Sequence, residues 1–168
     1  FHPIIEADRN ILCAGREPND DDRAAIRQAD AIILSQGCTG ALYQMVRDHG
    51  RAWFPNLDTR FDAPGKIGQA RLFRKIGAAH PPTVPYDSLA VYRRSPWTGP
   101  YPAVVKLNWG GEGETVFRAD DPQGLDIILD TVARFESTGQ TGFVVQRHVP
   151  SRHRSLRAVV IGDQRTFY

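Results

Sequence analysis

The chain has 168 residues, of which 41% are hydrophobic and 24% are charged. This length fits one globular unit or two small subdomains, and this composition excludes an intrinsically disordered segment. The formal net charge is only +2, and no apolar run approaches the ~20 residues that span a bilayer, so we expect neither a nucleic-acid partner nor a membrane segment.

Residues 1–60 alternate between helical and strand patterns. We expect a helix over residues 20–29 capped by Asp20, Asp21 or Asp22, a strand over 31–35 buried on both faces, a helix over 37–50, and a short strand over 52–54. This βαβ order predicts a small parallel sheet of the Rossmann-like kind. The domain looks incomplete, because residues 11–15 are the only candidate for an opening strand.

The middle of the chain changes character. We interpret residues 56–65, which are rich in Asp, Pro and Asn, as a linker. A helix is expected over 66–78, with Ile67, Ala70, Leu72, Phe73 and Ile76 on its apolar side. The three prolines in residues 80–86 exclude helix, so this segment is expected to be extended, and one or two helical turns are expected over 88–94.

The last third reads mostly as strands. We expect a β-hairpin from strands over 102–108 and 115–119, joined by a glycine-rich turn at 110–114. A helix over 120–138 and strands over 142–149, 155–163 and 164–168 follow. Gly162-Asp163 is expected to join the last two strands as a second hairpin.

The ends of the chain and its cysteines give simpler expectations. No cationic stretch precedes an apolar core, which excludes a signal peptide, and the missing initial Met suggests a processed chain or a fragment. Cys13 and Cys38 have neither CxxC spacing nor matching histidines. We therefore expect two reduced, buried thiols, no zinc site and a cytoplasmic protein.

Lys106 and the glycines that follow it are the strongest candidates for chemistry. The chain has 21 basic residues, of which only Lys66, Lys75 and Lys106 are lysines, so a retained lysine suggests a need for a compact point charge. Lys106 sits in an apolar strand, where a buried ammonium is costly unless it meets an anion. Lysine and a glycine loop together fit a polyphosphate site. The alternative is a lysine that reaches solvent beside an ordinary turn.

Other known motifs do not fit. Gly65-Lys66-Ile67 is not a P-loop, and the glycines at 110–113 lack dinucleotide spacing. Ser35 lacks a nucleophile-elbow context. Six basic residues within 147–157 allow a nucleic-acid patch, but no aromatic residue is interleaved, so an anion-binding rim explains them better. Trp109, beside the glycines, is interpreted mainly as a packing residue.

Taken in order, the motifs of residues 60–168 resemble the ATP-grasp superfamily, especially the branch with glutathione synthetase and the ribosomal-protein glutamate ligase (RimK-like). The match starts at Gly65-Lys66, which opens a K-x-x-x-x-x-L-x-x-x-x-G helix, and runs through the P-P-T segment, residues 104–117, 144–150 and 155–163. The resemblance implies an α/β fold. It consists of a partial Rossmann-like pre-ATP-grasp domain over 1–60, then an incomplete ATP-grasp domain over 61–168 with an antiparallel sheet and the start of a second subdomain.

The resemblance also implies roles for residues. Lys66 is expected at the ATP phosphates, and Lys106 is expected to bridge the α-phosphate and adenine. The flexible lid is expected at Gly110, Gly111, Glu112 and Gly113. The adenine lining is expected at Gln146, Arg147, His148 and Val149, with backbone groups of Arg147 and Val149 reading the base. Arg157 is expected to point at phosphate or acceptor as the catalytic residue.

The sequence departs from the family pattern in three places. Gly65 stands where Asp is common, and Ser155 stands where Asp is usual. Because no acidic residue lies between 147 and 157, the ribose contact falls to His153 or Ser155. The magnesium ligands of the family, an Asp and then Glu-x-Asn, are expected beyond Tyr168, and Glu17-Pro18-Asn19 is a chance match. No metal ligand is therefore assigned, although ATP and Mg²⁺ are the implied cofactors.

The implied activity is an ATP-dependent carboxylate–amine ligase that works through an acylphosphate, with a small-molecule or peptide carboxylate and an amine as substrates. The chain alone is expected to be inactive, because it lacks the metal ligands. An ATP-grasp phosphotransferase and a non-catalytic nucleotide-binding module are the alternatives. A homo-oligomer is left open.

Overall fold

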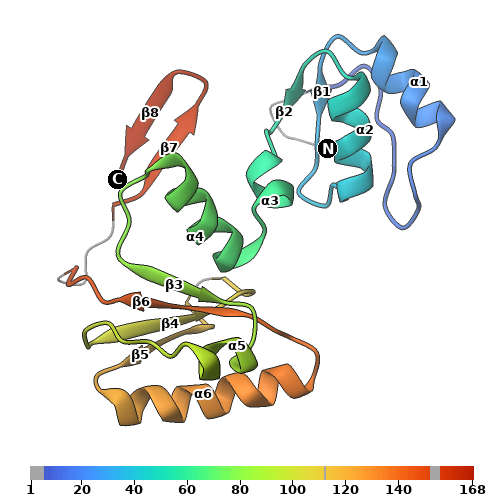
Figure 1. The fold of residues 1–168 in the computed structure, drawn as a ribbon. Coiled ribbons are helices and arrows are strands. Elements are labelled where there is room, and N and C mark those ends of the chain that lie inside the picture. The colour runs from blue at the N-terminus through green and yellow to red at the C-terminus, as the bar shows by residue number, and fades with distance from the viewer. Residues whose placement is uncertain (1–5, 112, 152–155) are drawn as a thin grey trace. The chain divides into compact units, whose positions relative to one another are not determined.

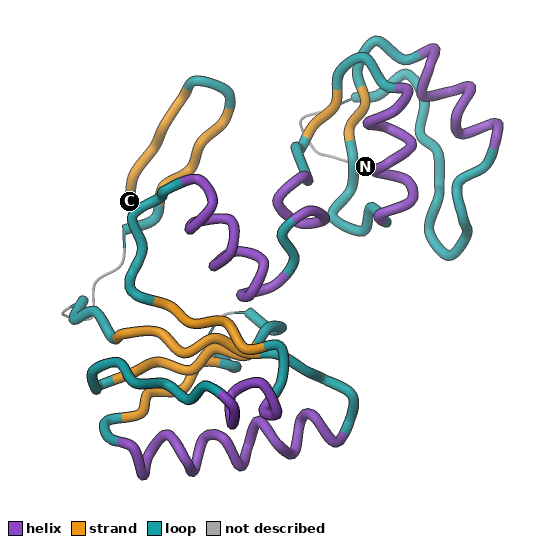
Figure 2. Tube along the Cα trace, in the orientation of Figure 1, coloured by secondary structure: helices purple, strands orange, loops and turns teal. Residues whose placement is uncertain are grey.

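The computed structural model describes residues 6–111, 113–151 and 156–168. It divides into two compact units, residues 1–62 and 63–168 (Figure 1). Helices and strands occur in both units, as the α/β prediction requires, and the larger sheet is antiparallel (Figure 2). Within the described ranges, every helix is too short or too polar to cross a membrane.

The first unit begins with helix α1, Asp20–Gln28. The cap is Asn19 and not one of the three aspartates expected: its side chain accepts from the Asp22 N–H at 3.0 Å. The Asp22 side chain in turn accepts from the Asn19 N–H at 2.9 Å, and the two hydrogen bonds form a capping box. Asp22 is buried and also pairs with Arg16, so its role is structural.

A parallel strand pair follows, as the βαβ pattern predicts. Strand β1, Ile32–Ile33, pairs with β2, Trp53–Phe54, and helix α2, Gly40–His49, lies between them in sequence. Both strands are shorter than expected, and Ile33 is 49% exposed, so the prediction of a strand buried on both faces is wrong. Residues 11–15, the candidate for an opening strand, form no strand.

The expected linker contains a short helix, α3, Asp58–Asp62. Tyr43 on α2 explains why this segment is ordered. Its hydroxyl donates to Asp58 Oδ1 at 2.8 Å and accepts from the Leu57 N–H at 2.9 Å. Its ring stacks on Phe61 at 5.2 Å between centroids. These contacts come from a distant helix, so composition alone did not indicate them.

The second unit is built on a four-stranded antiparallel sheet in the order β3-β6-β4-β5. The strands are β3 Thr83–Tyr86, β4 Ala103–Leu107, β5 Val116–Ala119 and β6 Phe143–Arg147. Strands β4 and β5 form the predicted hairpin. The proline-rich strand β3 lies at the edge of the sheet, where Pro85 removes no bond from a central ladder.

Two helices cover one face of this sheet. They are α5, Leu89–Arg94, capped by Ser88, and α6, Pro122–Ser137, capped by Asp121. The core between helices and sheet is apolar and aromatic. It includes Tyr86, Leu89, Trp97, Ala103, Val105, Leu107, Ala119, Leu125, Ile128, Val132, Phe143 and Val145.

Helix α4, Gly65–Ile76, packs on the opposite face (Figure 1). Ile67 and Ala70 bury against Val144 of β6. The helix ends at Gly77, whose φ of 66° is left-handed. The predicted apolar stripe is only half right, because Phe73 is 41% exposed and Ile76 is 62% exposed.

The chain ends in a two-stranded hairpin. Strand β7, Ala158–Ile161, pairs antiparallel with β8, Gln164–Phe167, as expected for the predicted hairpin. The turn uses Gly162 at a positive φ of 57°, so the glycine is needed there.

Candidate functional site

The face of the sheet below α4 carries the polar residues of the second unit. Strand register decides this, because residues directly paired across antiparallel strands point to the same side. Gln146 of β6 pairs with Thr83 on one side and with Val104 on the other. Lys106 pairs with Val144 of β6 in the next row of the same face. Thr83, Gln146 and Lys106 therefore project together toward α4.

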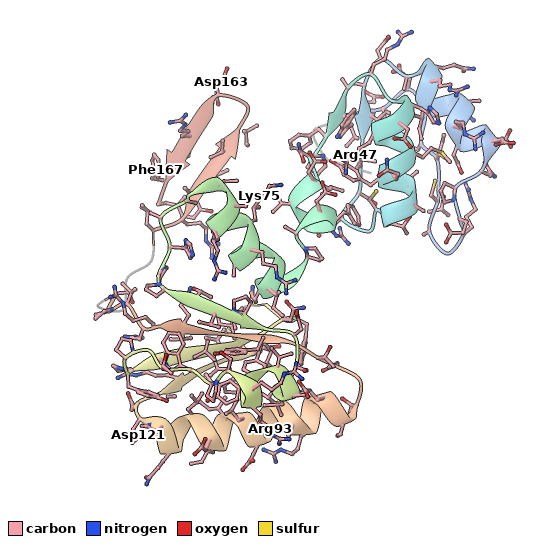
Figure 3. All side chains as sticks on the ribbon, in the orientation of Figure 1. Arg47, Lys75, Arg93, Asp121, Asp163 and Phe167 are labelled. Carbon is pink, nitrogen blue, oxygen red and sulfur yellow. The ribbon has the colours of Figure 1, made fainter. Side chains whose placement is uncertain are left out.

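A cavity lies between this face and α4. It is open to solvent and its cavity volume is about 70 Å³, which is smaller than a typical small-molecule site. It is lined by Lys66, Gln69, Ala70, Phe73, His80, Thr83, Lys106, Val144 and Gln146. Two of the three lysines of the chain thus border one space, while Lys75 is exposed in the last turn of α4 (Figure 3).

Lys106 is held in place by hydrogen bonds. Its Nζ donates to Gln146 Oε1 at 2.8 Å. Gln146 Nε2 donates to Thr83 Oγ1 at 2.7 Å, and that hydroxyl donates to the carbonyl of Pro81 at 2.7 Å. Burial lowers the pKa of Lys106, and the nearby charge of Lys66 lowers it further. In the part of the chain that the structure describes, neither lysine forms an ion pair.

Lys66 is positioned by a cap that comes from another element. Helix α4 has Pro64 at its N-cap and no side-chain cap of its own. Instead, Asn108 at the end of β4 accepts from the Ile67 N–H at 3.0 Å through Oδ1. Its carbonyl accepts from the Lys66 N–H at 3.4 Å. Asn108 therefore ties the start of α4 to the strand that carries Lys106.

This contact also explains Gly65, a departure from the family pattern. Gly65 has a φ of 68°, which favours glycine. A Cβ at this position would lie 2.3 Å from Asn108 Oδ1 and 2.5 Å from the Asn108 carbonyl oxygen. A side chain here would push away the residue that caps α4.

The predicted lid lies just after Asn108. Gly110 has a φ of 79°, and the turn is closed by Thr115, which donates to the Trp109 carbonyl at 2.8 Å. Gly111 and Gly113 have open space around them, and Glu112 lies outside the described residues. None of the described lid glycines lines the cavity. Trp109 packs edge-on against Phe135 at 5.6 Å, which agrees with its interpretation as a packing residue.

The predicted adenine segment continues from Gln146 along the end of β6. The Arg147 N–H donates to the Pro82 carbonyl and the His148 N–H to the Pro102 carbonyl, both at 3.0 Å. The Arg147 N–H is therefore already engaged, which restricts how its backbone could read a base. Arg147 and Val149 are exposed, and among the described residues only Gln146 of this group borders the cavity.

Arg157 is not among the residues that line the cavity. Arg157 precedes β7, where its N–H donates to the Tyr168 carbonyl at 2.9 Å and its guanidinium lies over the Tyr168 ring at 6.0 Å. His153 and Ser155 lie outside the described residues. These three assignments stay predictions.

Several residues that line the cavity were not predicted from the sequence as site residues: Gln69, Phe73, His80, Thr83 and Val144. Thr83 is the most informative of them, because a polar side chain only 7% exposed needs a partner. Its place after two prolines marked an extended segment, but its partner is 63 residues away in sequence. Only the strand register reveals that contact.

A magnesium site cannot be built from the residues described. They contain no group of three or more His, Cys, Asp or Glu side chains that could hold a metal ion. Mg²⁺ prefers several oxygen ligands, usually carboxylates, water and phosphate. The described residues therefore do not fit a magnesium site of their own.

Comparisons with known proteins identify the fold. No family model and no curated protein sequence matches the chain. Solved structures do match. A RimK domain ATP-grasp protein from Sphaerobacter thermophilus aligns with a TM-score of 0.54 at 18% identity, covering 78% of this chain and 50% of that one. Phosphoribosylamine–glycine ligase from Thermotoga maritima aligns with a TM-score of 0.56 at 16% identity, covering 90% and 38%.

D-Alanine–D-alanine ligase from Helicobacter pylori gives a similar result, with a TM-score of 0.52 at 12% identity, covering 76% of this chain and 39% of that one. The chain has the ATP-grasp fold, as its sequence motifs predict. It spans half or less of the length of these three proteins.

Proposed function

We propose that the chain supplies nucleotide-binding residues to an ATP-dependent carboxylate–amine ligase that works through an acylphosphate. The observation that carries this proposal is the meeting of Lys66 and Lys106 at one cavity, where burial and mutual repulsion lower the pKa of Lys106. Two ammonium groups without an ion-pair partner among the described residues favour a polyanionic ligand. The ATP-grasp fold, shared with D-alanine–D-alanine ligase and phosphoribosylamine–glycine ligase, supports ATP as that ligand.

The roles of the residues follow from the chemistry of phosphoryl transfer, which depends on positioning and charge neutralisation. Lys66 and Lys106 hold the triphosphate, and the glycines at 110–113 cover it. Gln146 to Val149 line the adenine. Arg157 stabilises the charge that develops as the carboxylate attacks. In this proposal residues 1–60 belong to the preceding Rossmann-like domain and residues 61–168 to the ATP-grasp domain.

The first test measures nucleotide binding to the full-length protein. Isothermal titration with MgATP should give a complex that Lys66→Met and Lys106→Met each weaken at least about tenfold, because each removes a charged contact to phosphate. Lys75→Met is the matched control: it removes a lysine from the same helix, α4, but outside the cavity. Equal binding by all four proteins would contradict the proposed site.

The second test identifies the reaction. The full-length protein is supplied with MgATP, an amine and a panel of carboxylates labelled with oxygen-18. In the proposed reaction a carboxylate oxygen attacks the γ-phosphorus and ADP leaves; the amine then attacks the acyl carbon and phosphate leaves with the labelled oxygen. Labelled phosphate together with an amide supports the ligase. A stable phosphorylated product without amide would replace it with a phosphotransferase, and binding without turnover would indicate a nucleotide-binding module.

A further inference from the structure

The hydrogen-bonded chain beside Lys106 has a fixed direction. The carbonyl of Pro81 can only accept a hydrogen bond, and the ammonium of Lys106 can only donate. The Thr83 hydroxyl therefore gives its proton to Pro81 and accepts from Gln146 Nε2, each at 2.7 Å. The amide of Gln146 must then turn its oxygen, Oε1, toward Lys106 Nζ, where the distance is 2.8 Å. The opposite amide orientation would place an N–H donor against the ammonium.

The residue that receives the ammonium is neutral. A carboxylate at the same position would form an ion pair with Lys106 and would cancel the charge that an anionic ligand needs. An amide oxygen fixes the direction of the side chain without cancelling its charge. Thr83, only 7% exposed, provides the anchor that keeps the amide from turning over.

We propose that Thr83 is a positioning residue for the nucleotide site: by fixing the amide of Gln146, it aims Lys106 into the cavity with its full positive charge available to a polyphosphate. This inference rests on the proposed function for its ligand. The effect of Thr83 on Lys106 concerns protein groups alone, so it can be tested without a ligand.

The charged and titratable groups around Lys106 limit which other residues could raise its pKa. Within the described residues, the packed elements contribute Lys66 and Arg74 from α4, His80 from the segment before β3, and Arg118 from β5. Arg74 donates to the Thr83 carbonyl at 3.2 Å, and Arg118 donates to Asp120 at 2.8 Å. These four groups are basic, so none of them favours the protonated form of Lys106. Among the described residues, the Gln146 oxygen is the contact that does.

The ligand-free test follows the ionisation of Lys106 by NMR. The full-length protein is labelled with carbon-13 at the lysine side chains, and single Lys→Arg variants assign the signals of Lys66, Lys75 and Lys106, the three lysines of this sequence. Thr83→Val removes the anchor and should lower the pKa of Lys106 below its value in the unchanged protein, because the accepting oxygen is no longer fixed. Thr83→Ser keeps the hydroxyl, so the pKa of Lys106 should stay at its value in the unchanged protein. Gln146→Glu should raise the pKa, because it adds an opposite charge.

Gln146→Met provides a second route to the same result. It removes the acceptor while Thr83 remains, so it should shift the pKa of Lys106 in the same direction as Thr83→Val. It decides the question if Thr83→Val fails to fold by circular dichroism. A Lys106 pKa unchanged in Gln146→Met and in any folded Thr83→Val protein would overturn the proposal.

The ligand test uses MgATP titration of the full-length protein. Thr83→Val should weaken binding about three- to tenfold and Thr83→Ser less than about twofold, since one fixed hydrogen bond is lost or kept. Gln146→Glu should weaken it about tenfold despite a fully folded protein. If Lys106→Met loses binding but Thr83→Val keeps it, the positioning role is wrong and the proposed function stands. If the unchanged protein binds no ATP, the proposed function fails, and the NMR result alone decides whether Thr83 controls Lys106.

Discussion

The two faces of the four-stranded sheet are made by alternate residues of the same strands, yet they have opposite chemistry. On β4, Val105 and Leu107 are completely buried against the helices α5 and α6. Lys106, between them, lies on the face below α4 and is held by Gln146 of the neighbouring strand. One residue of register therefore separates the apolar core from the candidate nucleotide site.

This division explains how a lysine with a lowered pKa is tolerated. The apolar face supplies the burial that stabilises the sheet, at roughly 25 cal/mol for each Å² removed from water. The polar face is covered by α4, which contacts it through Ile67 and Ala70. The strands are fixed from one side, so the other side can hold charges for a ligand.

A matched pair of substitutions on β4 tests whether the two faces of the sheet contribute differently to stability. Val105→Ala should lower the free energy of unfolding by about 2–3 kcal/mol, because it removes two methyl groups from a fully buried site and leaves a cavity. Val104→Ala, one residue earlier on the other face, is only partly buried and should cost less than about 1 kcal/mol. Urea unfolding measures both. Equal losses would show that the two faces contribute alike.

A second test concerns the start of α4. Gly65→Ala should cost about 2–3 kcal/mol, because a left-handed backbone and the contact with Asn108 both oppose a Cβ. Gly77→Ala is the control: its φ is 66°, similar to the 68° of Gly65, but a Cβ there meets nothing within 4 Å. It should cost about 1 kcal/mol. Thermal unfolding measures both losses, and the difference between them is the contribution of the contact with Asn108. Equal losses for the two variants would show that this contact does not oppose a side chain at residue 65.

A third test measures how much the buried charge of Lys106 lowers the free energy of unfolding. Lys106→Met should stabilise the ligand-free protein by about 0.5–2 kcal/mol at neutral pH, because it removes a desolvated charge. The folded-state pKa of Lys106 lies below the ordinary 10.5, so the penalty is complete below the folded pKa and disappears as pH rises toward 10.5. The advantage of the variant should therefore shrink with rising pH. Unfolding measured from neutral to alkaline pH checks this, and a constant or growing advantage would contradict it.

The smallest effect is expected where α4 is tied to the segment after β3 by charge alone. Arg71 pairs with Asp87 at 2.9 Å, but both side chains are more than half exposed. Arg71→Ala should cost less than about 1 kcal/mol, and the loss should fade at high salt. Denaturation at two salt concentrations measures it. A loss as large as that of Val105→Ala would mean that this pair, rather than apolar packing, holds the helix.

The sequence predicts those parts of the fold that depend on local patterns. Apolar periodicity and turn chemistry indicated α2, α4 and α6 and the hairpin of β4 and β5. Local errors arose where several residues compete for one role, as when Asn19 caps α1 in place of an adjacent aspartate.

The candidate site was predicted only in part, for a physical reason. Lys66 and Lys106 stood out because lysine is rare in this chain. Contacts across strands did not, since Asn108 caps a helix that begins 43 residues earlier and Thr83 holds a side chain 63 residues later. Such partners depend on strand register and helix placement, which a single sequence does not reveal.

The lowered pKa of Lys106 also has a consequence for covalent chemistry. An amine reacts with acylating reagents only in its neutral form, and at a given pH a lysine with a lowered pKa carries more of that form than an ordinary lysine does. The same burial therefore enlarges the fraction of this amine that can react at a given pH. Lys106 is accordingly a natural attachment point for lysine-directed labels aimed at this cavity, and an occupied cavity would shield it from them.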